Sequence, residues 1–495
     1  MSEGSNRRDF IKYTAATGMG FWVAAQKTFA DEADSKSPNE RVNIACVGLG
    51  GKGDSDSEQA AQVGNVVAIC DVDDNTLDRK ASHKDKDGSM PFAKAKKYND
   101  FRKMFDEMGK EFDAITVSIP DHNHAVASMM GIKNKKAVYC QKPLAHYVGE
   151  ARALRLAAEE NKVATQMGNQ GTAENGLREA VEVVQSGAIG GVKEFHVWTN
   201  RPIWPQAPMF LNRPMNIDAI PPELHWEEFL GPAPYRPFVQ KAKDSEGNEH
   251  NNVYQPFNWR GWWDWGTGAL GDMGCHTANM GYMALKLYEV HPTTLQAESG
   301  IINFETYPSW AHVTYEFPAR SDMPPVRVHW YEGHRDGKVV QPPDELKETV
   351  LAEYNKHLTR TQKRRGAVKK MSDSGCILVG DKGMIYSPND YGAEYAMLPD
   401  DKFENYQKPP QTLPRNGGGD LGMKKEWIAA IKGGPAAMGN FNYSARLSEF
   451  ILLGNVAIRA GAQHPLEWDG EAMKVTNWPE ANSFLKREYR KGYEL

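Results

Sequence analysis

The sequence predicts an α/β protein in which a doubly wound parallel sheet is followed by a second, larger domain. Between residues 41 and 165, short apolar runs alternate with helical segments, which is typical of a parallel sheet covered by helices. The chain has 495 residues, too many for one ordinary core. Hydrophobic residues make up 40% and charged residues 25% of the chain, as in a folded protein that is neither disordered nor embedded in a membrane.

Charge and cysteine usage exclude several classes of function. Lys and Arg number 59 against 64 Asp and Glu, so no broad positive field is available to hold nucleic acid. The five cysteines are scattered and form no C-x-x-C pair, which argues against a disulfide framework and against a zinc clip. We expect reduced thiols in the core and no metal site.

The first thirty residues have the pattern of an export signal. Arg7-Arg8 precedes a weakly hydrophobic stretch at 13–25, and Thr28 and Ala30 occupy small-residue positions. This pattern predicts a twin-arginine signal peptide at 1–30 and a linker at 31–40, with export to the periplasm or beyond. The stretch is too short to span a bilayer. The alternative is a basic N-terminus with no such meaning.

A glycine-rich turn opens the predicted sheet and suggests a cofactor. The apolar run 41–47 leads directly into Gly48-Leu49-Gly50-Gly51-Lys52-Gly53. Gly48 would permit the tight turn, Gly50 would let the backbone approach a pyrophosphate, and Gly53 would let the next helix pack closely. We predict that this loop binds a dinucleotide; the alternative is a turn that only connects strand and helix.

The identity of the dinucleotide follows from the next strand. The run 66–70 ends in Asp71, eighteen positions after Gly53, and the three residues that follow Asp71 include no basic group. A carboxylate at this position accepts hydrogen bonds from the ribose hydroxyls and repels a 2′-phosphate. We therefore expect NAD as the cofactor.

Two further strands end in polar residues. The apolar run 113–120 leads to Pro120, Asp121 and His124, a helix is expected around 125–134, and the run 137–140 leads to Gln141 and Lys142. Ligands of doubly wound sheets bind beyond the carboxyl ends of the strands. These five residues are therefore candidates for the cofactor site.

The motifs together resemble one enzyme family. The glycine loop, Pro120-Asp121-x-x-His124, Gln141-Lys142-Pro143 and Asp272-x-Gly274-x-His276 occur in the order typical of the Gfo/Idh/MocA family of oxidoreductases. The resemblance implies a Rossmann domain at 41–165 and a substrate and oligomerisation domain at 166–495, built on a large, open, mostly antiparallel sheet. It also implies oxidation of a sugar or polyol hydroxyl, or the reverse, and a homodimer or homotetramer.

The chain departs from the family pattern at two positions. The motif usually reads Glu-Lys-Pro, but residue 141 is Gln, and a frequent Asp beyond the motif histidine is Asn279. The first departure removes a negative charge expected near the nicotinamide ribose.

Three residues are candidates for the catalytic chemistry. Hydride transfer from a carbinol needs a group that takes the hydroxyl proton. The resemblance assigns proton transfer or hydroxyl orientation to Lys142, acid/base work to His276 and substrate binding to Asp272, and it leaves open whether Lys142 and His276 exchange roles. Asp272 and His276 would share one helix face. They could also be a helix-start pair or metal ligands, although no third ligand is evident.

Aromatic stretches point to a carbohydrate substrate. Residues 259–265 contain four tryptophans, and aromatic rings pack against the C–H faces of sugars, although any single tryptophan is more often a core residue. We expect Asn169, Arg260 and Trp263 to bind substrate with Asp272 and His276. The polar segment 205–252 is expected to cover the cofactor or a neighbouring subunit, and the charged segment 338–370 to be a solvated insertion.

The main hypothesis is an exported NAD-dependent oxidoreductase that acts on a sugar, glycoside or polyol. One alternative is a glycoside hydrolase that retains its NAD, oxidises a ring hydroxyl transiently and releases the aglycone by elimination; it needs an additional base that the sequence does not identify. A sugar-binding protein with a vestigial Rossmann domain is the third reading, which Lys142, Asp272 and His276 argue against.

Overall fold

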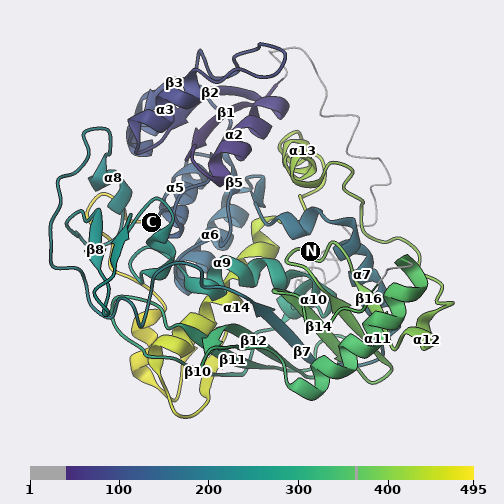
Figure 1. The fold of residues 1–495 in the computed structure, drawn as a ribbon. Helices are drawn as coiled ribbons and strands as arrows, with labels where there is room; N and C mark the ends of the chain where they lie inside the picture. Colours follow the sequence, from purple (N-terminus) through teal and green to yellow (C-terminus); the bar gives the residue numbers. More distant parts are fainter. Residues whose placement is uncertain (1–40, 363–365) are drawn as a thin grey trace, which may run out of the picture.

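The computed structural model describes residues 41–362 and 366–495 (Figure 1). The predicted signal peptide and linker lie outside these residues.

The N-terminal domain has the expected parallel sheet. Its six strands run in the order β3-β2-β1-β4-β5-β6, with every pair parallel. The strands are β1 (Asn43–Val47), β2 (Asn65–Cys70), β3 (Lys96–Tyr98), β4 (Ala114–Val117), β5 (Ala137–Cys140) and β6 (Thr165–Met167). The connecting helices are α2 (Lys52–Val63), α3 (Asp74–Ala81), α4 (Phe101–Met108), α5 (Asp121–Lys133) and α6 (Val148–Asn161). The strand order reverses between β1 and β4, so the ligand crevice of such sheets opens there.

The expected domain boundary between residues 165 and 166 falls inside β6. This strand pairs with β5 in the first sheet, and the chain leaves that sheet only after Met167.

The second domain has a ten-stranded sheet. Nine of its strands follow the order β16-β15-β14-β7-β12-β11-β10-β17-β18, and β13 pairs with β12 beside this path. Along the path, only β7 and β12 pair in parallel. The strands are β7 (Val192–Thr199), β10 (Thr294–Ser299), β11 (Trp310–Phe317), β12 (Val326–Arg335), β13 (Lys338–Val339), β14 (Gly375–Gly380), β15 (Gly383–Ser387), β16 (Ala396–Leu398), β17 (Leu466–Asp469) and β18 (Lys474–Val475). The expected large, open, mostly antiparallel sheet is confirmed.

Helices join the two sheets into one body. The long helix α14 (Phe441–Ala460) packs on α6 and β6 of the first domain and on β10 and β11 of the second. Helix α9 (Gly268–Thr277) packs against α14, β7 and β12, and α10 (Asn279–Ala284) packs on α9 and on α7 (Asn175–Gln185). Helix α13 (Gly419–Ile431) lies beside α2 (Figure 1) and buries Trp427 in the core of the first domain.

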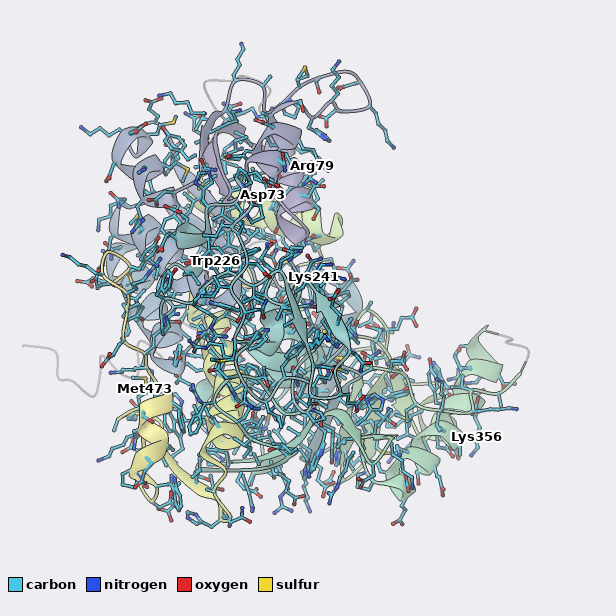
Figure 2. All side chains as sticks on the ribbon, turned by 60° about the vertical axis from the view of Figure 1, so that its left-hand side comes forward. Asp73, Arg79, Trp226, Lys241, Lys356 and Met473 are labelled. Atoms are coloured by element: carbon cyan, nitrogen blue, oxygen red, sulfur yellow. The ribbon has the colours of Figure 1, made fainter. Side chains whose placement is uncertain are left out.

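The polar segment 205–252 lies over the first domain. It contains α8 (Trp226–Leu230) and the hairpin of β8 (Lys241–Lys243) with β9 (Glu249–Asn251), and it shares an apolar core with residues 253–265. The His225 amide donates to the Val72 carbonyl at 2.8 Å, and the Asp74 amide to the Glu223 carbonyl at 3.0 Å. Figure 2 shows Asp73 and Trp226 at this junction. The segment therefore borders the end of β2 that carries Asp71.

The segment 338–370 is only partly the solvated insertion that was expected. It forms the helix α11 (Asp344–Gln362), whose Val350 is fully buried in a cluster with Trp198 and Tyr331 of the second sheet. Lys356 is exposed and lies on the part of this helix that projects from the molecule (Figure 2).

All five cysteines are buried and free, as expected for thiols in the core. Within the described residues, no helix combines the length and the apolar character needed to cross a membrane.

Candidate active site

The glycine loop between β1 and α2 has the geometry that its glycines predict. Gly48 has a φ of +85°, and a Cβ there would lie 2.2 Å from the Ser118 carbonyl oxygen. A Cβ on Gly53 would lie 2.3 Å from the Gly48 oxygen, whereas one on Gly50 or Gly51 would meet nothing within 4 Å. No side chain caps α2. The loop thus leaves open space at a helix N-terminus, which fits the pyrophosphate of a dinucleotide.

Asp71 is held at the end of β2. Its carboxylate accepts the Leu49 amide at 2.8 Å and the Asp73 amide at 3.1 Å. Burial raises the pKa of Asp71 to about 6, against these hydrogen bonds. The Leu49 contact joins the carboxylate to the glycine loop, as a ribose-binding group requires.

Charged residues from both domains meet at the start of α2. Lys52 Nζ lies 3.0 Å from Asp56 and 2.5 Å from Asp420, which lies 368 residues away on α13. Lys424, also on α13, is fully buried and contacts Asp56 at 2.7 Å. Burial opposes ionisation of Asp56, but Lys424 and Lys52 outweigh it and lower the pKa of this carboxyl. Asp56 is therefore an anion inside the protein.

The same carboxylate explains the glutamine at position 141. Gln141 Nε2 donates to Asp56 Oδ2 at 2.7 Å, and Ser118 Oγ donates to the same oxygen at 2.8 Å. A glutamate at 141 would place a second negative charge against a buried one. In this chain, Asp56 on α2 supplies the carboxylate of this region, and Gln141, directly after β5, supplies an amide. A Cβ at Gly168 would lie 2.3 Å from Gln141 Nε2, so that glycine makes room for the amide.

Lys142 and Asp272 meet across the domains. Lys142 Nζ donates to the Asp272 carbonyl at 2.7 Å and lies 3.1 Å from its Oδ1, which also accepts Arg260 Nε at 3.2 Å. Burial alone would raise the pKa of Asp272, but Lys142 and Arg260 outweigh it and lower the pKa well below its usual value. The anion thus fixes the lysine and the arginine beside each other.

His276 lies one helical turn after Asp272 on α9. Its Nδ1 is 2.8 Å from Asn169 Oδ1, and Asn169 Nδ2 donates to the Cys275 carbonyl at 2.5 Å. The amide is thereby oriented with its oxygen toward the ring, so Nδ1 carries the proton and Nε2 keeps a lone pair. Burial and the nearby Lys142 lower the pKa of His276, so the ring is neutral. Such a ring can accept a proton at Nε2.

Asn169 was expected to bind substrate, and the structure corrects this role. The side chain is completely buried, and both of its amide atoms are bonded to α9. It positions His276.

Two residues of the predicted cofactor set lie in contacts within the protein instead. Asp121 Oδ2 accepts from the amide and hydroxyl of Thr267, just before α9. The ring nitrogens of His124 lie 2.7 Å from the carbonyls of Ile119 and Pro143. Burial lowers the pKa of His124, but Cys140, Asp121 and the Pro143 carbonyl raise it to about 9. Because its nitrogens are used, His124 ties the β4 and β5 loops together and cannot hydrogen-bond a cofactor. Pro120 caps α5 between them.

Trp263 is also not available to a substrate. It is buried, its Nε1 donates to the Asn303 carbonyl at 3.1 Å, and its ring packs on Tyr307. The tryptophan-rich stretch is therefore mainly a core. The aromatic residue with an exposed ring here is Phe257, whose face contacts the Arg260 guanidinium at 4.5 Å.

No group of three or more His, Cys, Asp or Glu side chains within the described ranges 41–362 and 366–495 is placed to hold a metal ion. Asp272 and His276 instead have the lysine, arginine and amide partners given above.

Family models match both domains of the chain. The model described as "Oxidoreductase family, NAD-binding Rossmann fold" covers residues 42–169, and its companion, "Oxidoreductase family, C-terminal alpha/beta domain", covers residues 178–323. The chain belongs to the Gfo/Idh/MocA family of oxidoreductases. It binds NAD through its Rossmann domain.

Individual relatives are more distant. The inositol 2-dehydrogenase of Rubrobacter xylanophilus is 26% identical over 168 residues, 33% of this chain and 45% of the relative. An uncharacterized oxidoreductase of Streptococcus pneumoniae is 30% identical over 90 residues, 18% of this chain and 24% of the relative. The chain thus matches less than half the length of these two relatives.

Solved structures share the fold. The WlbA dehydrogenase of Bordetella pertussis, in complex with NADH and UDP-GlcNAcA, has a TM-score of 0.52 at 13% identity, with 87% of this chain and 100% of that chain covered. The aldose-aldose oxidoreductase of Caulobacter crescentus, complexed with glycerol, has a TM-score of 0.51 at 14% identity, with the same coverage.

The sequence alone missed several residues of the site. Asp420 and Lys424 follow a run of three glycines at 417–419, which signals a tight loop but not its partner. Asp56 lies within α2, and Tyr391 lies in a turn between β15 and β16. Their partners are far away in the sequence, so no local pattern identifies them.

Proposed function

We propose that the protein transfers a hydride between a secondary hydroxyl of a sugar, glycoside or polyol and the nicotinamide of NAD. One observation carries this proposal: Lys142, at the end of β5, meets the α9 face that presents Asp272 and the neutral His276. This pairing places a cation and a proton acceptor together beyond the carboxyl end of a Rossmann strand, where such sheets bind their ligands.

The residues present supply the parts of the reaction that belong to the protein. The glycine loop and Asp71 would hold the pyrophosphate and the ribose of NAD, which would supply the hydride acceptor or donor. His276 takes the hydroxyl proton at Nε2 during oxidation and returns it during reduction. Lys142, held by Asp272, donates a hydrogen bond to the hydroxyl oxygen and stabilises the negative charge that develops there.

The class of substrate is supported by the relatives. One is named an inositol 2-dehydrogenase, one structure holds UDP-GlcNAcA and another is an aldose-aldose oxidoreductase. All three names refer to polyhydroxylated molecules. Arg260 and the exposed Phe257 beside Asp272 suit such a ligand, because guanidinium groups bind hydroxyls and aromatic rings pack on sugar C–H faces.

The test is turnover on a panel of free sugars, polyols and aryl glycosides, with NADH and aglycone followed together. NADH that accumulates in proportion to substrate, without aglycone release, supports the dehydrogenase. Aglycone release over many turnovers with no net NADH would establish the NAD-retaining glycoside hydrolase instead. Lys142→Met should abolish the measured turnover, while Lys135→Met at the exposed end of α5 should not.

We also propose export by the twin-arginine route and assembly into a homodimer or homotetramer. Arg7-Arg8 and the small residues before position 30 support the first. Family resemblance supports the second. Replacement of Arg7 and Arg8 by Lys should block export of the full chain, and light scattering of the purified protein should give the mass of two or four chains.

A further inference from the structure

Tyr391 reaches the candidate site from the second sheet. It lies in the loop between β15 and β16, and the centroid of its ring is 4.9 Å from that of His276 at an interplanar angle of 83°. The edge-to-face contact is a favourable arrangement of two rings. A residue 115 positions after His276 in the chain thus borders the proposed proton acceptor.

The loop that carries Tyr391 is fixed in place. Asn389 Oδ1 accepts the amides of Tyr391 and Ala393, both at 3.1 Å. A Cβ on Gly171 would lie 2.8 Å from the Tyr391 carbonyl oxygen, and one on Gly176 would lie 2.0 Å from that of Ala393. Only glycine at these two positions lets the loop pack so closely on the start of α7. The position of Tyr391 is therefore fixed by Asn389 within its own loop and by the two glycines against which the loop packs.

No hydrogen bond of the Tyr391 hydroxyl is found within the described part of the chain, and the residue is half-buried. Two other tyrosines of this domain use their hydroxyls within the protein: Tyr395 donates to Glu179 Oε1 at 2.6 Å, and Tyr443 donates to Asn279 Oδ1 at 2.7 Å. Burial raises the pKa of the Tyr391 phenol, and the charges of Asp390, Lys52, Asp272 and Asp420 act on it as well. The phenol therefore lies within electrostatic range of the start of α2, of Asp272 and of α13.

We propose that Tyr391 contacts the substrate and determines specificity: its hydroxyl binds a second hydroxyl, next to the one that reacts at His276 and Lys142. The reacting oxygen needs both Lys142 Nζ and His276 Nε2. A phenol beside His276 is placed to meet the neighbouring substituent. The enzyme therefore prefers carbohydrates with vicinal hydroxyls. This inference rests on the proposed function.

The test compares a substrate with its analogue that lacks the adjacent hydroxyl. On the full substrate, Tyr391→Phe should raise KM and lower kcat/KM about 10-fold, the value of one hydrogen bond, with kcat nearly unchanged. On the deoxy analogue, wild type and variant should be equal. Tyr391→Phe keeps the ring against His276, so the pH profile of kcat should not move. Tyr395→Phe is the matched control and should behave as wild type on both substrates.

Two results would overturn the inference. An equal loss on both substrates, or no loss on either, would show that Tyr391 does not bind that hydroxyl while leaving the proposed oxidoreductase intact. Failure of the wild type to oxidise or reduce any member of the panel would reject the proposed function, and this inference with it.

Discussion

The proposed role of His276 as a proton acceptor depends on the buried side-chain amide of Asn169. Asn169 Oδ1 accepts a hydrogen bond from the Nδ1–H of His276, because the Nδ2 of the same amide donates to the Cys275 carbonyl. The free lone pair on Nε2 is thus set by a residue that no substrate touches. A mutation at Asn169 should therefore affect the rate of the reaction more than the binding of NAD.

Asn169→Ala should lower kcat about 10²-fold, because the tautomer and the direction of His276 are no longer fixed. The NAD dissociation constant, measured by fluorescence titration, should stay the same. Asn161→Ala, at the end of α6, is the control. A variant that loses NAD binding and activity in equal measure would show that Asn169 supports the fold alone.

The affinity for NAD should depend on pH through Asp71. Its pKa of about 6 in the protein means that the carboxyl becomes protonated as the pH falls through 6. The protonated group accepts the ribose hydroxyls less well, so the NAD dissociation constant should rise below pH 6, approaching tenfold per pH unit. Above pH 7 it should be constant. Calorimetry from pH 5 to 8 measures this, and Asp71→Asn should give weak binding with a flat profile. A wild-type profile that is flat over the same range would contradict the assignment.

The residues that the sequence could predict are those with a local signal. Glycines at fixed spacing, an acid at the end of the second strand, and a lysine and a histidine in motifs located the loop, Asp71, Lys142 and His276. Asn169, Asp420 and Tyr391 matter through partners more than 100 residues away. Trp263 was misassigned because a run of tryptophans has the same local pattern in a core and in a sugar site.

At the scale of elements, strand β12 carries a buried carboxyl group whose pKa is raised. Glu332 is buried, and the indole N–H of Trp330 donates to its Oε2 at 2.7 Å. Burial raises the pKa of Glu332 from 4.5 to about 8. The folded protein therefore holds a proton there that the unfolded chain releases above pH 4.5.

The consequence is a falling stability with rising pH. Between pH 4.5 and 8 the native state binds more protons at Glu332 than the unfolded state, so the free energy of unfolding drops by up to about 1.4 kcal/mol per pH unit. Glu332→Gln keeps the acceptor for Trp330 and removes the titration. Its melting temperature should exceed that of wild type increasingly toward pH 8. Parallel curves for the two proteins from pH 5 to 8 would disprove this.

Elements were predictable where periodicity dominated. The strands β4 and β5 lie within the apolar runs 113–120 and 137–140, and α5 covers most of the helix expected around 125–134. Helix α11 is rich in charged residues, so the sequence predicts a solvated segment. Its few apolar residues are buried against the second sheet, which the local sequence does not indicate.

At the scale of the whole molecule, the second domain borders the cofactor crevice on several sides. The segment 221–230 borders β2, α13 covers α2, and Tyr391 and His276 close the remaining side. The C-terminal arm 479–495 packs on the first domain, where Arg487 binds Glu150. These contacts make the two domains interdependent.

Mutation of Asp420 on α13 tests the contact between the two domains at the glycine loop. Its carboxylate holds Lys52 in the glycine loop at 2.5 Å and competes for it with a pyrophosphate. Asp420→Asn should lower the NAD dissociation constant about 2- to 5-fold, the range of a partly exposed ion pair, and the gain should vanish at high salt. Asp401→Asn on the exposed α12 (Asp400–Phe403) is the control. Weaker binding in Asp420→Asn would show that the ion pair acts by closing the crevice.

Hydride transfer from the substrate to NAD can be followed directly with an isotope label. A sugar or polyol that is turned over should be prepared with deuterium on its carbinol carbons and incubated with the purified protein and NAD. The account predicts reduced cofactor that carries one deuterium by mass spectrometry, and neither label nor reduction with Lys142→Met. Reduced cofactor without deuterium, or turnover of the substrate with the label retained at carbon, would contradict it.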